Sequence, residues 1–114
     1  MIGDLTLDTI HAGLNGLNAR RAAAEDAVAN SETPGYIARN VDFEGELSRA
    51  IDGGDPLRAT PTTSSTTDEA LPNGNNVRLE REIAGLTDTS LRQQLLVEAA
   101  NAKFRLLRTV ITGQ

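Results

Sequence analysis

The chain has 114 residues, no cysteine and a formal net charge of −5 at neutral pH. This length accommodates one domain, and the lack of cysteine excludes a disulfide framework and thiolate metal ligands. The acidic balance argues against nucleic acid as a partner, because binding depends on basic groups that displace the counterions of the phosphates. Aromatic residues make up 3% of the chain, which excludes a large aromatic core.

No apolar run reaches the roughly 18 residues of a membrane-spanning helix. The first residues lack the basic and apolar regions of a secretory signal. We therefore expect neither a membrane span nor a cleaved signal peptide.

Residues 5–30 have the spacing of an amphipathic helix. Apolar side chains recur in alternating steps of three and four residues, which is the heptad pattern of a helix that packs against other helices. Arg21 fills the one polar position of this seam, and Gly13 and Gly16 are weak points that cost about 1 kcal/mol each relative to alanine. The predicted assembly interface on this helix comprises Leu7, Ile10, Leu14, Leu17 and Val28.

The run Asn30-Ser31-Glu32-Thr33-Pro34-Gly35-Tyr36 predicts a stop and a change of direction. A residue before proline is pushed out of the helical region. Proline presets φ at the second position of a turn, and glycine accepts a positive φ at the third. We predict a type II turn over Thr33–Tyr36 that displays the tyrosine beyond it. The first unit of the chain is therefore an axial helix and turn over residues 1–33.

Residues 34–75 are predicted to be an irregular, flexible middle segment. A short helix over residues 42–51, capped by Asp42, is compatible with the apolar spacing there. Residues 59–70 are rich in threonine, serine, proline and acidic residues, as in a flexible linker. Any strand is expected to be brief and to lie near residues 56–63.

The third unit, residues 76–114, contains a longer helical pattern over residues 77–112, with Asn75 or Asn76 as its expected N-cap. Two apolar stripes run side by side along it, a face too wide for one partner helix. The predicted interface seam on this helix comprises Leu79, Ile83, Leu86, Val97, Phe104, Leu107 and Ile111. The expected fold is all-α and elongated, with the two long terminal helices packed as a coiled-coil-like pair.

The sequence contains little that points to catalysis. His11 is the one histidine, and a metal site would need further ligands. No glycine-rich phosphate loop is present. We expect no enzyme activity, no cofactor, no metal and no small-molecule substrate. Wide apolar faces are instead typical of interfaces between subunits.

Several motifs resemble those of bacterial flagellar rod and hook proteins. The segment from Ala29 to Tyr36 is similar to the motif that closes the first helix in this family. Residues 38–43, 75–82 and 103–111 are similar to segments of its proximal rod members. The turn residues that carry the family motif are Asn30, Thr33, Pro34, Gly35 and Tyr36. A departure lies just before the turn, where Ala27-Val28-Ala29-Asn30 replaces the usual Asn-Ile-Ala-Asn.

The resemblance implies a structural subunit of the flagellar basal body, located in the periplasmic rod. Such a subunit would pass unfolded through the flagellar type III export apparatus, without a cleaved signal peptide. It would assemble with copies of itself and other rod proteins into a helical tube around the export channel and transmit torque. The rod–MS-ring junction protein and the MS ring would be its neighbours. Two alternatives stay open: another proximal rod protein, or a soluble helical adaptor or chaperone.

Overall fold

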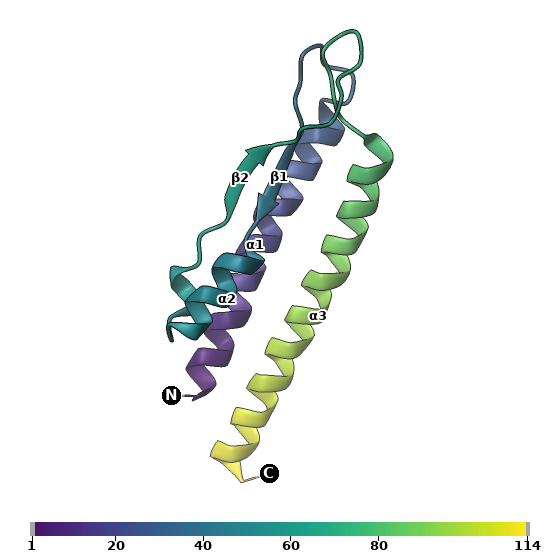
Figure 1. The fold of residues 1–114 in the computed structure, drawn as a ribbon. Coiled ribbons are helices and arrows are strands. Elements are labelled where there is room, and N and C mark those ends of the chain that lie inside the picture. The colour runs from purple at the N-terminus through teal and green to yellow at the C-terminus, as the bar shows by residue number, and fades with distance from the viewer. Residues whose placement is uncertain (1, 114) are drawn as a thin grey trace.

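The computed structural model describes the backbone of residues 2–113 and the side chains of residues 5–113. Two long antiparallel helices, α1 (Ile2–Ala29) and α3 (Leu79–Thr112), run along the molecule (Figure 1). The extents along the principal axes are 64, 28 and 13 Å, so the predicted elongated shape is confirmed. Both predicted helices are present, with ends that differ from the predicted ones by up to three residues.

Helix α1 lies in the middle of the molecule, between α3 on one side and the middle segment on the other (Figure 1). Small side chains allow both neighbours to approach its backbone closely. An ideal Cβ built on Gly16 would lie 2.2 Å from the Phe43 ring, and one on Gly13 would lie 3.0 Å from Leu96. The buried apolar residues of α1 are Ile10, Ala12, Leu17, Ala23, Ala24 and Ala27. The two glycines therefore weaken the helix locally but make room for neighbouring side chains.

The middle segment contains more regular structure than the sequence predicted. Strand β1 (Arg39–Asp42) pairs antiparallel with β2 (Thr62–Ser65), with Val41 opposite Thr63. Helix α2 (Glu44–Asp52) and the 3₁₀ turn η1 (Pro56–Arg58) connect the two strands. The molecule is therefore mostly helical with a small two-stranded sheet, and all-α is only approximately right.

The strand prediction was only partly right. β2 is brief and begins inside the predicted range of 56–63, although its second half extends further into the predicted linker, and β1 was not expected. Val41 is buried, whereas all four side chains of β2 are exposed. Because the two strands are separated by 19 intervening residues, their pairing leaves no local pattern in the sequence.

Both predicted helix caps were also wrong. Arg78 precedes α3 and makes no side-chain capping bond. Phe43 precedes α2, likewise without a side-chain cap, and Asp42 belongs to β1. Asn75 and Asn76 are fully buried and bind loop backbone instead, as the next subsection describes.

Candidate assembly interface

The turn after α1 has the geometry that the sequence predicted. Gly35 has φ of +76°, in the left-handed region that favours glycine. The N–H of Tyr36 donates to the carbonyl of Thr33 at 3.2 Å, which closes the four-residue turn. The Thr33 hydroxyl donates to Asn30 Oδ1 at 3.0 Å, and Asn30 Nδ2 donates to the carbonyl of Asp26 at 2.8 Å. The turn is thus fixed to the last turn of α1.

The segment that precedes α3 packs directly against this turn. The N–H of Gly35 donates to the carbonyl of Asn73 at 2.9 Å, and the N–H of Asn76 donates to the carbonyl of Tyr36 at 3.1 Å. An ideal Cβ on Gly74 would lie 3.2 Å from the Cα of Gly35, so the two glycines let the two backbones approach. The two loops meet at the end of the molecule opposite the chain termini (Figure 1).

Asn75 holds the two loops together from inside. Its Nδ2 donates to the carbonyls of Asn30 at 2.9 Å and Thr33 at 2.8 Å. Its Oδ1 accepts from the N–H of Val77 at 2.8 Å. One buried amide therefore bonds three backbone groups, adding a second donor to two carbonyls of the turn and supplying an acceptor for the N–H of Val77.

Asn76 performs a similar role toward the middle segment. Its Oδ1 accepts from the N–H of Ala38 at 2.7 Å, while its Nδ2 donates to Thr66 Oγ1 at 2.8 Å and the carbonyl of Asp68 at 3.2 Å. Sequence reasoning missed both asparagines as loop-binding residues, because Asn before a helix is ordinarily a cap. Only their long-range partners distinguish the two roles.

A small apolar cluster lies beneath the joined loops. Ala27, Ala38 and Val77 are its buried members, and Tyr36 packs against it half-buried. The expectation that the tyrosine is displayed was therefore wrong in the isolated chain. Ala27 is completely buried, so its methyl group is part of this packing.

A second polar joint attaches α2 to α1. The Arg20 guanidinium lies 4.8 Å from the centre of the Phe43 ring and donates to the carbonyl of Val41 at 2.8 Å. It also forms an ion pair with Glu44 at 2.7 Å. The hydrogen bond from Arg20 lowers the pKa of the Glu44 carboxyl to about 2 and outweighs the opposing effect of partial burial.

Helix α3 contacts α1 through a row of residues that only partly overlaps the seam predicted from the sequence. Arg21 donates to Ser90 Oγ at 2.8 Å, and Gln93 Nε2 donates to Asn18 Oδ1 at 2.7 Å. With 3.6 residues per turn, one row of α3 faces α1. It comprises Glu82, Thr89, Gln93, Leu96, Ala100, Lys103 and Leu107, all half-buried or buried.

The predicted seam residues are buried to different degrees on α1 and on α3. On α1, Ile10 and Leu17 are buried, and Leu7, Leu14 and Val28 are half-buried. On α3, Leu86 and Leu107 are half-buried, but the other five seam residues are exposed. We call these five the first flank: Leu79, Ile83, Val97, Phe104 and Ile111, which are 43 to 83% exposed.

A second apolar row lies on the opposite side of the α1-facing row. We call it the second flank, and its members are 56 to 72% exposed: Leu91, Leu95, Leu106 and Val110. Helical geometry places polar residues, including Gln94 and Arg105, between the two flanks on the outermost side of α3. Helix α3 thus presents two separate apolar surfaces, and contiguous exposed apolar surfaces are typical of protein–protein interfaces.

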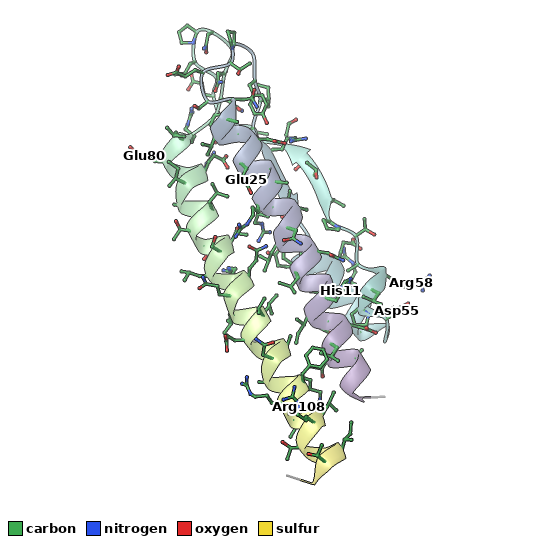
Figure 2. All side chains as sticks on the ribbon, turned by 180° about the vertical axis from the view of Figure 1, so that it is seen from behind. His11, Glu25, Asp55, Arg58, Glu80 and Arg108 are labelled. Atoms are coloured by element: carbon green, nitrogen blue, oxygen red, sulfur yellow. The ribbon has the colours of Figure 1, made fainter. Side chains whose placement is uncertain are left out.

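Other kinds of site find little support in the described part of the chain. Among the described residues, no group of three or more metal-ligating side chains comes together. Within the same residues, no helix combines the length and apolarity that crossing a membrane requires. His11 is exposed on α1 (Figure 2) and belongs to no such group of possible metal ligands among these residues.

No protein-family model matches the chain. Curated proteins similar to it share one name. The flagellar basal body rod protein FlgB of Bacillus subtilis (strain 168) is 28% identical over 121 residues, covering 95% of this chain and 94% of that protein. FlgB of Escherichia coli (strain K12) is 25% identical over 74% of this chain and 76% of its own length. FlgB of Salmonella typhimurium is 24% identical over 75% and 78%. This modest similarity supports the assignment to flagellar rod proteins that the motifs suggested.

Proposed function

We propose that this chain is a structural subunit of the proximal rod of the bacterial flagellar basal body. The observation that carries the proposal is the pair of exposed apolar flanks on α3, in a chain similar to rod proteins over most of its length. A helix with one apolar flank would be satisfied by one neighbour. Two flanks on opposite sides of the row that faces α1 fit a helix with a neighbour on each side, as in the wall of a tube.

In this proposal the subunits form a helical tube around the export channel, and the paired helices α1 and α3 are its axial elements. The tube transmits torque, and in each subunit the helices that carry it are continuous over most of the molecule's length. The joined loops set the direction in which the middle segment leaves the helical pair. Copies of this chain, other rod proteins, the rod–MS-ring junction protein and the MS ring are the proposed neighbours.

The proposal includes passage of the unfolded chain through the flagellar export apparatus without cleavage of a signal peptide. A chain without cysteine is compatible with this route, because no disulfide can form and block the unfolded state. The small apolar cluster and the thin 13 Å dimension also indicate a chain whose folded state buries little surface on its own.

The direct test is deletion of the gene in its source organism, followed by electron microscopy of isolated basal bodies. Loss of the rod, with recovery on re-expression, is the expected result. Complete basal bodies in the deletion strain would contradict the proposal. An adaptor or chaperone would instead be absent from purified basal bodies, so antibody labelling of the rod in complemented cells separates these two classes.

The turn provides a sharper test at a single residue. Gly35→Val forces a β-branched residue to a φ of +76°, which costs roughly 1–2 kcal/mol or more. We expect it to impair rod assembly and swimming. Ser65→Val is the matched control, because Ser65 is exposed in β2, where a valine is well tolerated. Equal swimming by both variants would contradict a role for the turn in assembly.

A further inference from the structure

The joined loops, at the end of the molecule opposite the termini (Figure 1), contain one of the two places where glycine follows asparagine in this chain. Asn73 and Gly74 lie in the turn before α3, and Asn15 and Gly16 lie inside α1. The backbone nitrogen of the residue after an asparagine can attack the side-chain amide, and glycine hinders this attack least because it has no Cβ. Each Asn–Gly pair is therefore chemically able to deamidate without an enzyme.

Deamidation at Asn73 takes two steps. The backbone nitrogen of Gly74 loses its proton and bonds to Cγ of Asn73, the bond between Cγ and Nδ2 breaks, and ammonia leaves with that proton. Water then opens the five-membered imide at either of its carbonyls. One product is aspartate. The other is isoaspartate, whose main chain runs through Cβ and Cγ and is longer by a carbon atom. Nothing is oxidised or reduced, and water is the only co-reactant.

Hydrogen bonds restrain the reacting groups of Asn73 and Gly74 in the folded chain. The Gly74 N–H donates to the carbonyl of Leu71 at 2.8 Å, which closes a four-residue turn. Asn73 Oδ1 accepts from the N–H of Asn75 at 3.1 Å, and the Asn73 carbonyl accepts from the N–H of Gly35 at 2.9 Å. Ring closure must break the first of these bonds, because the Gly74 nitrogen has to lose the proton that it donates.

The two Asn–Gly pairs are protected by parts of the fold that open at different cost. The nitrogen of Gly16 lies inside α1, where each N–H bonds the carbonyl four residues earlier, and Gly16 packs against the Phe43 ring. Freeing this nitrogen requires α1 to unfold. Gly74 lies in a loop beside the exposed Asn73, so parting the two loops is enough to free its nitrogen. Local openings of this kind need less free energy than global unfolding.

We propose that Asn73 is a site of spontaneous deamidation whose rate is controlled by the loop joint, the contact between residues 30–36 and residues 71–77. While the joint is closed, the reaction is suppressed. When the loops part or the chain is unfolded, the reaction proceeds. Reactant and gate lie within one chain, so the inference does not depend on the proposed rod function.

The closed joint has no room for the isoaspartyl product. The extra carbon atom displaces the carbonyl to which the Gly35 N–H donates. An ideal Cβ on Gly74 would already lie 3.2 Å from the Cα of Gly35, so there is little space to absorb the change. Isoaspartate that forms at position 73 in an unfolded chain therefore keeps the loops apart after refolding.

Mass spectrometry of the full chain, incubated at neutral pH either folded or in concentrated urea, measures deamidation at Asn73 and Asn15. In urea, both sites should react at similar rates. In the folded chain, Asn73 should react at least about tenfold more slowly than in urea, and Asn15 more slowly still. Asn73→Gln is the negative control, because glutamine has to close a less favourable six-membered ring. Equal rates at Asn73 in the folded and unfolded chain would overturn the proposal.

Gly35→Ala tests whether the joint is the gate. Nothing lies within 4 Å of an ideal Cβ at Gly35, so alanine adds no clash, but a φ of +76° strains it and weakens the joint. In the folded chain this variant should deamidate about tenfold faster at Asn73, with an unchanged rate in urea. An unchanged rate in the folded variant would show that the joint does not control the site.

Low urea concentrations provide a second test on the parent chain, which holds even if Gly35→Ala does not fold. Parting the loops exposes less surface than unfolding α1 does. Urea below the unfolding transition should therefore accelerate Asn73 only slightly and Asn15 steeply. Parallel acceleration of both sites would contradict control by the joint.

Refolding tests the isoaspartyl product in a chain carrying Asn15→Gln, which removes the other site at an exposed helix position. The isoaspartyl form is made in urea, refolded and purified. The matched control adds Asn73→Asp, which has the same charge without the extra carbon atom. The amide hydrogen of Gly35 should exchange at least about tenfold faster in the isoaspartyl form than in this control. Equal exchange in both would refute the claim that isoaspartate keeps the loops apart.

Discussion

The packing of Phe43 on α1 depends on the missing side chain of Gly16. All three ring atoms nearest to an ideal Cβ at this position lie 2.2 to 2.6 Å from it, closer than atoms can approach without movement. Gly16→Ala gains about 1 kcal/mol of helix propensity but must displace a buried ring, which costs typically 1–3 kcal/mol. We expect a net decrease in the free energy of unfolding of about 1 kcal/mol or more, measured by urea titration with circular dichroism.

Gly85→Ala is the matched control for this prediction. Gly85 also lies inside a long helix, but nothing is within 4 Å of its ideal Cβ. Alanine there should raise the free energy of unfolding by up to about 1 kcal/mol. If both alanine variants were stabilised to the same degree, the close packing of Phe43 on Gly16 would be refuted.

The buried amide of Asn75 supports a second prediction at the residue scale. Asn75→Ala removes three hydrogen bonds and leaves the carbonyls of Asn30 and Thr33 without that partner. We expect a loss of about 3 kcal/mol in the free energy of unfolding. Asn40→Ala is the control, since Asn40 is exposed and should change stability by less than about 0.5 kcal/mol. Similar small effects of both substitutions would rule out a structural role for the Asn75 side chain.

At the scale of elements, the Arg20–Glu44 pair predicts how the attachment of α2 to α1 depends on pH. The pKa of Glu44 falls from 4.5 to about 2 in the folded chain. A lowered pKa means that the folded state binds this proton less readily than the unfolded state does. The stabilisation is therefore complete above about pH 4.5 and is lost as the pH falls toward 2. Because the Glu44 side chain is 55% exposed, solvent screening limits the contribution to about 1 kcal/mol.

Glu44→Gln tests this pH dependence. The variant should be less stable than the parent chain at pH 6, and the difference should shrink as the pH approaches 2. Thermal unfolding at a series of pH values measures it, with Glu25→Gln, on the exposed side of α1 (Figure 2), as the control. A difference between Glu44→Gln and the parent that is constant from pH 6 to pH 2 would show that the ion pair does not form.

The helices, strands and turns also differ in how well the sequence predicts them. Both long helices and the Thr33–Tyr36 turn were predictable, because helix periodicity and Pro-Gly turn chemistry are local. The β1–β2 pair and the roles of Asn75 and Asn76 depend on partners tens of residues away, which no local pattern records. The five exposed seam residues of α3 show a further limit. Heptad spacing identified apolar positions correctly, but it could not tell that α1 would contact the row between the two stripes and leave most of both stripes exposed.

At the scale of the whole molecule, α1 and α3 differ in how many sides are covered. Helix α1 is enclosed by α3 and the middle segment, whereas α3 contacts α1 along one row and has exposed flanks. Beyond Leu107, the described residues of α3 are all exposed. An isolated helix end without tertiary packing is marginal in water, so its amide hydrogens should exchange readily.

Hydrogen exchange measured by mass spectrometry should therefore give a gradient in the isolated chain. We expect residues 10–24 of α1 to be the best protected, residues 86–96 of α3 to be intermediate, and residues 104–112 to exchange at least about tenfold faster than α1. In assembled oligomers or purified rods, residues 104–112 should gain the most protection, because the second flank is then covered. Residues 10–24 provide the internal control and should change little. Uniformly strong protection of both helices in an isolated monomer or dimer would instead indicate a self-sufficient helical adaptor and contradict the rod subunit.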